Sequence, residues 1–340
     1  MARQINRREL LTSLLAVPLV GGCRAEFDAA SHASIERALD GIEGNIVGPS
    51  FELGHRLREH SSFNLPADRF RDVGIVIVGG GIAGLAAAWR LKRSGYDDFI
   101  LLELESSPGG TSRSDRSPVI AYPWGAHYLP APTRENPELV TLLDELGVVE
   151  GVDRDGEPLI AEQFLCREPE ERIFYKGRWY EGLYLHAGAS GEDLRQWRLL
   201  EDEIERWVAW RDASGRRAFA LPMRSATDDP EVTRLDSMTM ADWLAERGLD
   251  SARLRWMVDY GCRDDYGLRL DQTSAWAGLF YFASRIARPG DEARALVTWP
   301  EGNGRIVNHL YAAVKSHVAT GRAVASVNPV QNADGSQVEV

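Results

Sequence analysis

The stretch VIVGGGIAGL, residues 76–85, constrains the fold of this chain more than any other feature. A continuous apolar run that is closed by glycine is typical of a central parallel strand buried on both faces. The residues that follow, up to Gly95, have a helical pattern, and Gly95 is well suited to end a helix. The run DFILLELE then predicts a second strand. The sequence therefore predicts a βαβ unit, whose crossover is right-handed by default.

The glycines of this stretch have the spacing G-x-G-x-x-G, at Gly79, Gly81 and Gly84. In this pattern the first glycine permits a tight turn, the second lets the backbone approach a pyrophosphate, and the third lets the helix pack closely on the strand. The helix would begin at Ile82 and Ala83, where free N–H groups and the helix dipole favour an anion. The turn is therefore predicted to bind phosphate groups.

A carboxylate stands where a dinucleotide site needs one. Glu103 comes 19 residues after Gly84, at the end of the second predicted strand. About 20 residues is the separation expected for an acid that accepts a hydrogen bond from a ribose hydroxyl. The alternative is that Glu103 is a solvated strand end. Together with the strand, turn and helix, the spacing predicts that this part of the chain binds a dinucleotide.

A second glycine pair, Gly109 and Gly110, follows Glu103 closely in ELESSPGGTSRS. On these residues the chain resembles the FAD-dependent amine-oxidase and phytoene-desaturase superfamily of flavoproteins. The resemblance implies FAD as the cofactor. It also implies that Arg113 approaches the cofactor phosphates, although Arg113 is displaced by two residues from the commonest spacing in that superfamily.

Two further segments are similar to this superfamily. YPWGAHYL contains Gly125, Ala126 and His127, whose backbone would lie near the isoalloxazine; the alternative for His127 is an ordinary loop histidine. WPEGNGRIVNHL followed by TGRAVASV is similar to the returning segment, in which Val324 would lie on a strand beside the adenine. Members of the superfamily continue beyond such a segment to a second flavin-contacting motif, so we expect this chain to lack the C-terminal part.

The predicted fold class is α/β: a Rossmann-like FAD-binding domain with a doubly wound parallel sheet, and an inserted, mainly helical substrate domain. The expected boundaries are 72–134 for the first part of the FAD-binding domain, 135–285 for the insertion and 286–340 for the incomplete second part. Within the insertion, RIFYKGRWYEG predicts a hairpin that turns at Lys176 and Gly177. YGCRDDYG, residues 260–267, either ends a helix with a solvated turn or lines the substrate pocket.

The first 22 residues have the pattern of a signal peptide. An arginine pair, Arg7 and Arg8, precedes a short apolar run that is far below the length needed to span a bilayer. The pair resembles a twin-arginine export signal, and VGGC resembles a lipobox that would lipidate Cys23. We expect an exported chain, periplasmic or anchored on the periplasmic side through Cys23, with residues 23–71 as an extension. A simple cleaved signal is the alternative.

Composition excludes several classes of function. The net charge of −12 argues against nucleic-acid binding, which needs a basic face. The cysteines Cys23, Cys166 and Cys262 have no zinc-like spacing, and no metal site is predicted. The resemblance to the flavoprotein superfamily implies a FAD-dependent oxidoreductase that moves a hydride from an amine or another hydrophobic small molecule onto flavin N5, with O₂ or a quinone as electron acceptor. The alternative is a non-redox or inactive FAD-binding chain, either a mutase-like scaffold or a truncated fragment.

Overall fold

The computed structural model describes residues 46–59, 70–166, 171–286, 288–290, 295–332 and 335–340. The chain divides into two compact units, Met1–Val47 and Gly48–Val340, and every helix and strand given below belongs to the second. Within the described residues, no helix is long and apolar enough to cross a membrane.

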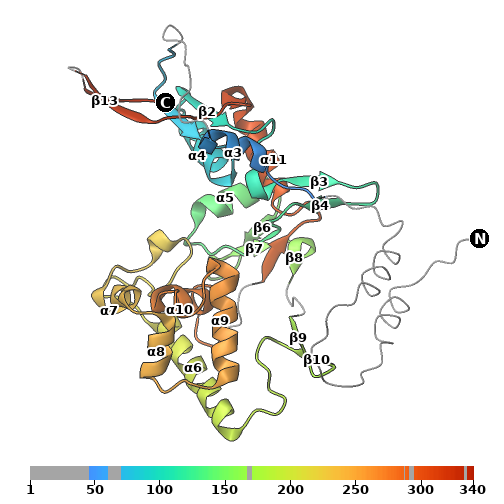
Figure 1. The fold of residues 1–340 in the computed structure, drawn as a ribbon, viewed down its shortest axis with the longest axis vertical. Coiled ribbons are helices and arrows are strands. Elements are labelled where there is room, and N and C mark those ends of the chain that lie inside the picture. The colour runs from blue at the N-terminus through green and yellow to red at the C-terminus, as the bar shows by residue number, and fades with distance from the viewer. Residues whose placement is uncertain (1–45, 60–69, 167–170, 287, 291–294, 333–334) are drawn as a thin grey trace, which may run out of the picture. The chain divides into compact units, whose positions relative to one another are not determined.

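A parallel sheet of three strands carries the predicted βαβ unit. Its order is β1 (Ile75–Val78), β2 (Phe99–Glu103) and β12 (Val318–Thr320), and both neighbouring pairs are parallel. The helices α4 (Ile82–Arg93) and α11 (Gly304–Val314) pack against each other. Figure 1 shows β2, α4 and α11 close together. The Rossmann-like architecture with a parallel sheet is confirmed.

The position of β1 in the sheet differs from the prediction. A central strand buried on both faces was expected, but β1 is an edge strand, and Ile75 and Val78 are 37% and 55% exposed. The reason is that, among the described strands, β1 pairs only with β2, so its other edge has no neighbour. The buried strand is β2, in which Phe99, Leu101 and Glu103 point into the core.

One hydrophobic core lies under this sheet. It combines side chains of α4, β2 and α11 with side chains of α5 (Pro137–Glu145) and β11 (Leu296–Thr298). Leu85 of α4, Leu101 of β2, Leu143 of α5, Val297 of β11 and Leu310 of α11 are completely buried. Because α5 contributes to it, the start of the predicted insertion packs with the nucleotide-binding part. The domain boundaries themselves stay a prediction.

Small antiparallel sheets surround this core. One has the order β5 (Tyr128–Pro130), β11, β8 (Leu165–Cys166), so that segments far apart in sequence meet. The others are the pairs β3 (Ser114–Arg116) with β4 (Ala121–Pro123), β6 (Val149–Val152) with β7 (Pro158–Ile160), and β13 (Asn328–Asn332) with β14 (Gly335–Glu339). The remaining short elements are α3 (Phe51–Glu59), η1 (Gly110–Ser112), η2 (Glu162–Phe164), η3 (Met223–Ser225), η4 (Arg234–Ser237) and η5 (Lys315–His317).

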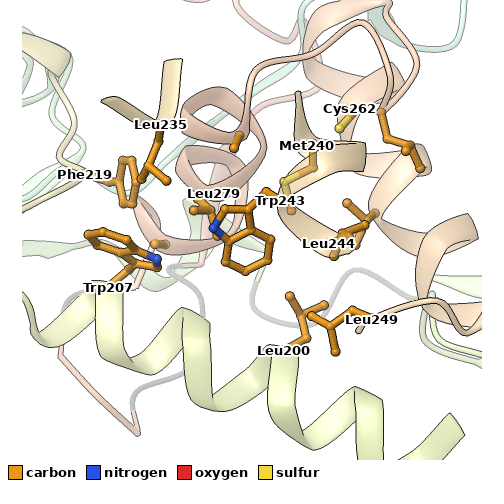
Figure 2. Close-up of a cluster of buried hydrophobic side chains, with 14 of the residues drawn as sticks. Leu200, Trp207, Phe219, Leu235, Met240, Trp243, Leu244, Leu249, Cys262 and Leu279 are labelled. Carbon is orange, nitrogen blue, oxygen red and sulfur yellow. The ribbon is translucent and has the colours of Figure 1, made fainter. Parts of the chain in front are cut away.

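A second hydrophobic core is built from helices, as predicted for the middle of the chain. The helices are α6 (Gly191–Ala209), α7 (Pro230–Thr233), α8 (Met240–Glu246), α9 (Ala252–Tyr266) and α10 (Ala275–Ala283). Figure 2 shows Trp207 of α6, Trp243 of α8 and Phe219, from the segment after α6, around Leu279 of α10. All four side chains are at most 2% exposed. Such large aromatic side chains supply much of the apolar area that a helical core buries.

The predicted hairpin is confirmed. Strands β9 (Arg172–Tyr175) and β10 (Arg178–Glu181) are antiparallel, with Arg178 opposite Tyr175. The turn residues Lys176 and Gly177 have φ values of 47° and 79°, as a two-residue turn of type I′ requires. Neither strand contributes a side chain to the two cores.

Candidate dinucleotide-binding site

The glycine turn between β1 and α4 is held by backbone hydrogen bonds. The N–H of Gly79 donates to the carbonyl of Leu102 at 2.8 Å, which fixes the end of β1 against β2. The φ of Gly79 is +94°, a conformation that residues with a side chain rarely adopt. The first position of the motif is therefore occupied by glycine for a backbone reason, as the pattern predicts.

The structure distinguishes the other two glycines of the motif by the space around them. A Cβ on Gly84 would lie 2.0 Å from the carbonyl oxygen of Gly79, so the packing of α4 on the turn requires glycine there. A Cβ on Gly81 would meet no atom within 4 Å, and the φ of Gly81 is −67°. Nothing in the protein itself therefore requires glycine at this position, and the open space next to the backbone suits a ligand.

The N-terminus of α4 faces this open space. Gly81 is the N-cap and makes no side-chain capping hydrogen bond, and the first turn holds no acidic residue. The first intrahelical bond is donated by Leu85 to the carbonyl of Gly81 at 3.0 Å. Ile82 and Ala83 are exposed, and their N–H groups come before that first bond, so they have no acceptor within the helix. Backbone donors and the positive end of the helix dipole are what a phosphate group needs.

Glu103 supports the turn from below. It is 9% exposed, and its two carboxylate oxygens accept hydrogen bonds from the N–H of Gly80 at 2.6 Å and of Glu105 at 2.8 Å. The carboxylate thus lies next to the glycine turn, as the spacing predicts. A contact with a ribose hydroxyl stays a prediction.

The second glycine pair lies against the first. The N–H of Gly109 donates to the carbonyl of Gly80 at 2.7 Å, and Gly81 and Gly109 form an isolated parallel bridge. Gly109 and Gly110 have φ values of +121° and +53°, so both positions favour glycine. A Cβ on Gly109 would also lie 2.9 Å from Cγ1 of Val307 in α11. The glycine turn at Gly80 and Gly81 and the pair Gly109 and Gly110 therefore form one continuous backbone surface.

Arg113 lies beside this surface, but its guanidinium group has protein partners. Its Nη1 donates to Glu105 at 2.7 Å, and the guanidinium stacks on the ring of Trp124 at 3.8 Å from the centroid. The side chains of Arg113 and Glu105 are only 14% and 15% exposed. The predicted contact of Arg113 with a phosphate stays a prediction, and it would compete with Glu105.

The loop with Gly125, Ala126 and His127 joins the same site through its backbone. The N–H of Ala126 donates to the carbonyl of Thr111 at 3.2 Å, and its carbonyl accepts from the N–H of Asn303 at 3.1 Å. His127 is exposed, and its Nδ1 lies 2.9 Å from the carbonyl oxygen of Gly125. The structure thus brings Gly125 to His127 next to the segment after Gly110, although a role beside a flavin stays a prediction.

Val324 does not lie on a strand. It was expected on a strand, but β12 ends at Thr320 and β13 begins only at Asn328, so Val324 lies in the irregular segment between them. The reason is that the pairing with β2 is replaced there by two single bonds, from the N–H of Gly321 to Glu105 and from the N–H of Arg322 to Glu103. Val324 follows two residues later and is half-buried. Cys23, the predicted lipidation site, lies outside the described residues.

Several residues of the site were not singled out from the sequence. Gly80 donates to Glu103, Glu105 binds Arg113, and Trp124 stacks on Arg113. A Cβ on Gly302 would lie 2.8 Å from Cα of His127, which makes it the glycine that lets α11 approach the loop. Gly302 lies within the quoted WPEGNG segment, which was the available signal. Trp124 lies within YPWGAHYL, but its stacking on Arg113 depends on the fold and has no signal in the sequence.

Two buried polar atoms in this site have no hydrogen-bond partner in the described chain. They are Nε1 of Trp124 and Oδ1 of Asn303, on either side of the loop at Gly125. Buried polar atoms in native proteins almost always have a partner, so such atoms point to a ligand or ordered water. Together with the open space at Gly81, they fit a large polar cofactor.

The segment at 260–267 ends a helix, as one of its two interpretations predicts. It forms the end of α9, and Gly267 caps the helix with a φ of 65°. Cys262 is in the helical core, and burial raises the pKa of its thiol. Burial, and then the nearby Asp264, raise the pKa of Glu171, and the phenol of Tyr260 interacts electrostatically with Asp264 and with Tyr128 of β5. The cation Arg285, which lowers the pKa of Glu171, belongs to the same group of charges.

Known proteins share these features. The model of the NAD(P)-binding Rossmann-like domain matches residues 77–146. AofH of Mycobacterium tuberculosis, a candidate flavin-containing monoamine oxidase, is 27% identical over 199 residues, or 57% of this chain and 38% of that protein. The human peroxisomal N(1)-acetyl-spermine/spermidine oxidase is 42% identical over 64 residues, or 18% of this chain and 12% of that protein. This chain is thus homologous to flavin-containing amine oxidases.

The similarity is not restricted to amine oxidases, and it is partial. A Baeyer-Villiger monooxygenase of Streptomyces coelicolor is 39% identical over 66 residues, which are 19% of this chain and 13% of that protein. Among solved structures, a putrescine oxidase triple mutant superposes with a TM-score of 0.52 at 18% identity, over 78% of this chain and 54% of that chain. This likeness shows the fold. The chain spans about half the length of that structure and less than half of AofH.

Proposed function

We propose that this chain binds FAD and acts in an oxidoreductase that takes a hydride from an amine. The observation that carries the proposal is the open space beside Gly81, bounded by the N-terminus of α4 and by Gly109 and Gly110. The protein's own packing does not require glycine there, whereas a bound pyrophosphate would. The homology to flavin-containing amine oxidases supports FAD as the dinucleotide.

The residues present fit such a cofactor. Backbone N–H groups at Ile82 and Ala83 would bind the pyrophosphate, and Glu103 would orient the ribose while it holds the turn. The loop from Trp124 to His127 would line the flavin end, where the unpartnered Nε1 of Trp124 needs an acceptor. When bound, FAD supplies the hydride acceptor, and the protein supplies position, polarity and exclusion of water.

An amine donor is supported by the homology to flavin-containing amine oxidases. O₂ or a membrane quinone would then take up the electrons.

The test begins with the visible absorbance of the purified chain, loaded with FAD. We expect a flavin spectrum whose absorbance is lost anaerobically when an aliphatic diamine is added, and the same loss with dithionite as the control. Loss with dithionite alone, for every amine tried, would favour the second candidate, a chain that binds FAD without turnover of its own. A chain that stays colourless with excess FAD would overturn the cofactor proposal.

We also propose that residues 1–22 direct export and that Cys23 is lipidated, which would place the enzyme at the periplasmic face of a membrane. The support is the sequence pattern alone. Cell fractionation and labelling with a radioactive fatty acid test it. Cys23→Ser should abolish the label and release the chain, and a labelled or cytoplasmic Cys23→Ser chain would contradict the proposal.

A further inference from the structure

An exposed aromatic surface joins the hairpin β9–β10 to α9. We define this aromatic face by Phe174, Tyr175, Trp179 and Trp256, which are 55%, 39%, 66% and 51% exposed. The rings of Phe174 and Trp179 lie 5.1 Å apart across the hairpin. Because side chains alternate along a strand, Phe174 and Trp179 lie on one face of the hairpin and Tyr175 on the other. Exposed aromatic rings gathered in this way mark an interaction site rather than ordinary surface composition.

A pocket between the hairpin and the start of α9 joins the two parts of the aromatic face. It has a volume of about 430 Å³ and is lined by Ile173, Phe174, Tyr175, Leu185, Ala252, Arg253 and Trp256. The lining is apolar except for Arg253, whose guanidinium donates to the carbonyls of Leu185 at 2.6 Å and Gly188 at 3.0 Å. Arg253 therefore shapes the wall of the pocket, and the occupant of the face must be recognised by its apolar surface and by charges elsewhere.

Those charges are on the hairpin itself. The hairpin segment 171–181 has three cations and two acids: Arg172 lies opposite Glu181 at its base, whereas Lys176 and Arg178 lie at or next to the turn, although the whole chain carries a net charge of −12. Lys176 stands at the turn, with its Nζ 5.2 Å from the ring of Tyr175. Four strand residues span roughly 13 Å, which exceeds the Debye length of about 8 Å at physiological ionic strength. Lys176 and Arg178 are therefore largely screened from acids that lie beyond the base of the hairpin.

We infer that the aromatic face docks on an anionic lipid surface. Tryptophan and tyrosine rings favour the boundary between headgroups and hydrocarbon, where an apolar ring and a polar edge are both satisfied. Lysine and arginine next to them are attracted to anionic headgroups. A second copy of this chain fits less well, because in a two-fold contact Lys176 and Arg178 of one copy would face the same cations of the other.

The test is co-sedimentation of the full chain with vesicles of phosphatidylcholine, with and without phosphatidylglycerol. We expect binding only to vesicles with phosphatidylglycerol. Two double variants, Lys176→Glu with Arg178→Glu and Phe174→Ser with Trp179→Ser, should each weaken binding about ten-fold or more. For the first pair the reason is that each cation contributes about a five-fold effect at an anionic surface. Neither pair contributes to a hydrophobic core, so circular dichroism should be unchanged.

The matched control changes exposed apolar residues elsewhere. Val119 and Ile120, between β3 and β4, are 91% and 54% exposed, and Val119→Ser with Ile120→Ser should leave binding intact. Residues 1–45 are the same in every variant, so they cannot account for a difference. Equal binding to both kinds of vesicle, or full binding by the hairpin variants, would overturn the inference. Dimerisation that only Phe174→Ser with Trp179→Ser abolishes would assign the face to a second copy instead.

Discussion

Gly81 and Gly84 belong to one motif, but they are glycine for different reasons. The φ of Gly81 suits any residue and its Cβ position is empty, so we expect Gly81→Ala to change the free energy of unfolding by less than about 0.5 kcal/mol without FAD. Gly84→Ala would force a methyl group to within 2.0 Å of the carbonyl oxygen of Gly79, which should cost about 1–3 kcal/mol. Urea denaturation of FAD-free protein measures both.

FAD affinity should rank the same two variants in a different way. The methyl group of Gly81→Ala would occupy the space proposed for the pyrophosphate, so titration with FAD should show weaker binding by a protein of unchanged stability. If Gly81→Ala binds FAD as tightly as the wild type, that space is not the phosphate site. Equal destabilisation by both substitutions would contradict the structural distinction.

Glu103 has a structural function that does not depend on a ligand. Its carboxylate accepts from two backbone donors, Gly80 and Glu105, whereas the amide of Glu103→Gln has one acceptor oxygen. One buried N–H group would lose its partner, so we expect a loss of about 1–3 kcal/mol in the free energy of unfolding without FAD. The exposed Glu150 serves as the control, because Glu150→Gln should have no effect. Unchanged stability of Glu103→Gln would show that water replaces the carboxylate.

Among the elements, α6 and α9 are joined by one carboxylate. Asp193 completes a capping box with Ser190 at the start of α6, and its Oδ1 accepts from Oγ of Ser251, the N-cap of α9, at 2.6 Å. The hydrogen bond from Ser251, followed by those from Ser190, lowers the pKa of Asp193 to about 2. Because the unfolded value is about 3.9, this contribution to stability is complete above it and is lost as the pH falls towards the folded value.

The pH dependence of unfolding tests this link. The wild type should lose stability between about pH 4 and pH 2, and Asp193→Asn should be less stable at neutral pH with a flatter dependence in that acidic range. Ser190→Ala is the comparison variant: it removes the cap at a cost of about 1 kcal/mol and one hydrogen bond to Asp193 but keeps the bond to Ser251, so its pH dependence should flatten less than that of Asp193→Asn. Parallel pH profiles for the wild type and Asp193→Asn would exclude Asp193 as the cause.

The elements also show which predictions local sequence can support. The hairpin at Lys176 and Gly177 was predictable because its turn has its own chemistry, and α4 was predictable because a glycine turn and a helical pattern coincide. The exposed edge of β1 was not, since an apolar run specifies a strand but not its neighbours. β12 was missed for the same reason: only its pairing with Leu101 to Glu103 makes Val318–Thr320 a strand. The ion pair of Arg113 with Glu105 likewise depends on rotamers that spacing does not specify.

At the scale of the whole molecule, the residues that the structure describes build two hydrophobic cores, one around the parallel sheet and one among the helices. Every proposed FAD contact lies with the first core. The predicted start of the insertion does not coincide with the change from one core to the other. The helix α5 follows that start and yet packs with the core of the parallel sheet. A ligand that binds only the first core raises the free energy of opening of that part by mass action. The helical core gains stability only to the extent that the two cores open together.

Hydrogen exchange with and without FAD therefore separates the two cores. At a free FAD concentration of about 100 times its dissociation constant, the gain of about 2.7 kcal/mol should slow exchange roughly 100-fold in α4, in the segments around Gly110 and Gly125 and in α11. Exchange in α6, α8 and α10 should change far less, and the Gly81→Ala variant at the same FAD concentration should show a smaller gain everywhere. Equal slowing in all of these helices would mean that the two cores open as one cooperative unit. Slowing confined to α6, α8 and α10 would place the cofactor in the helical part and remove the glycine turn from the site.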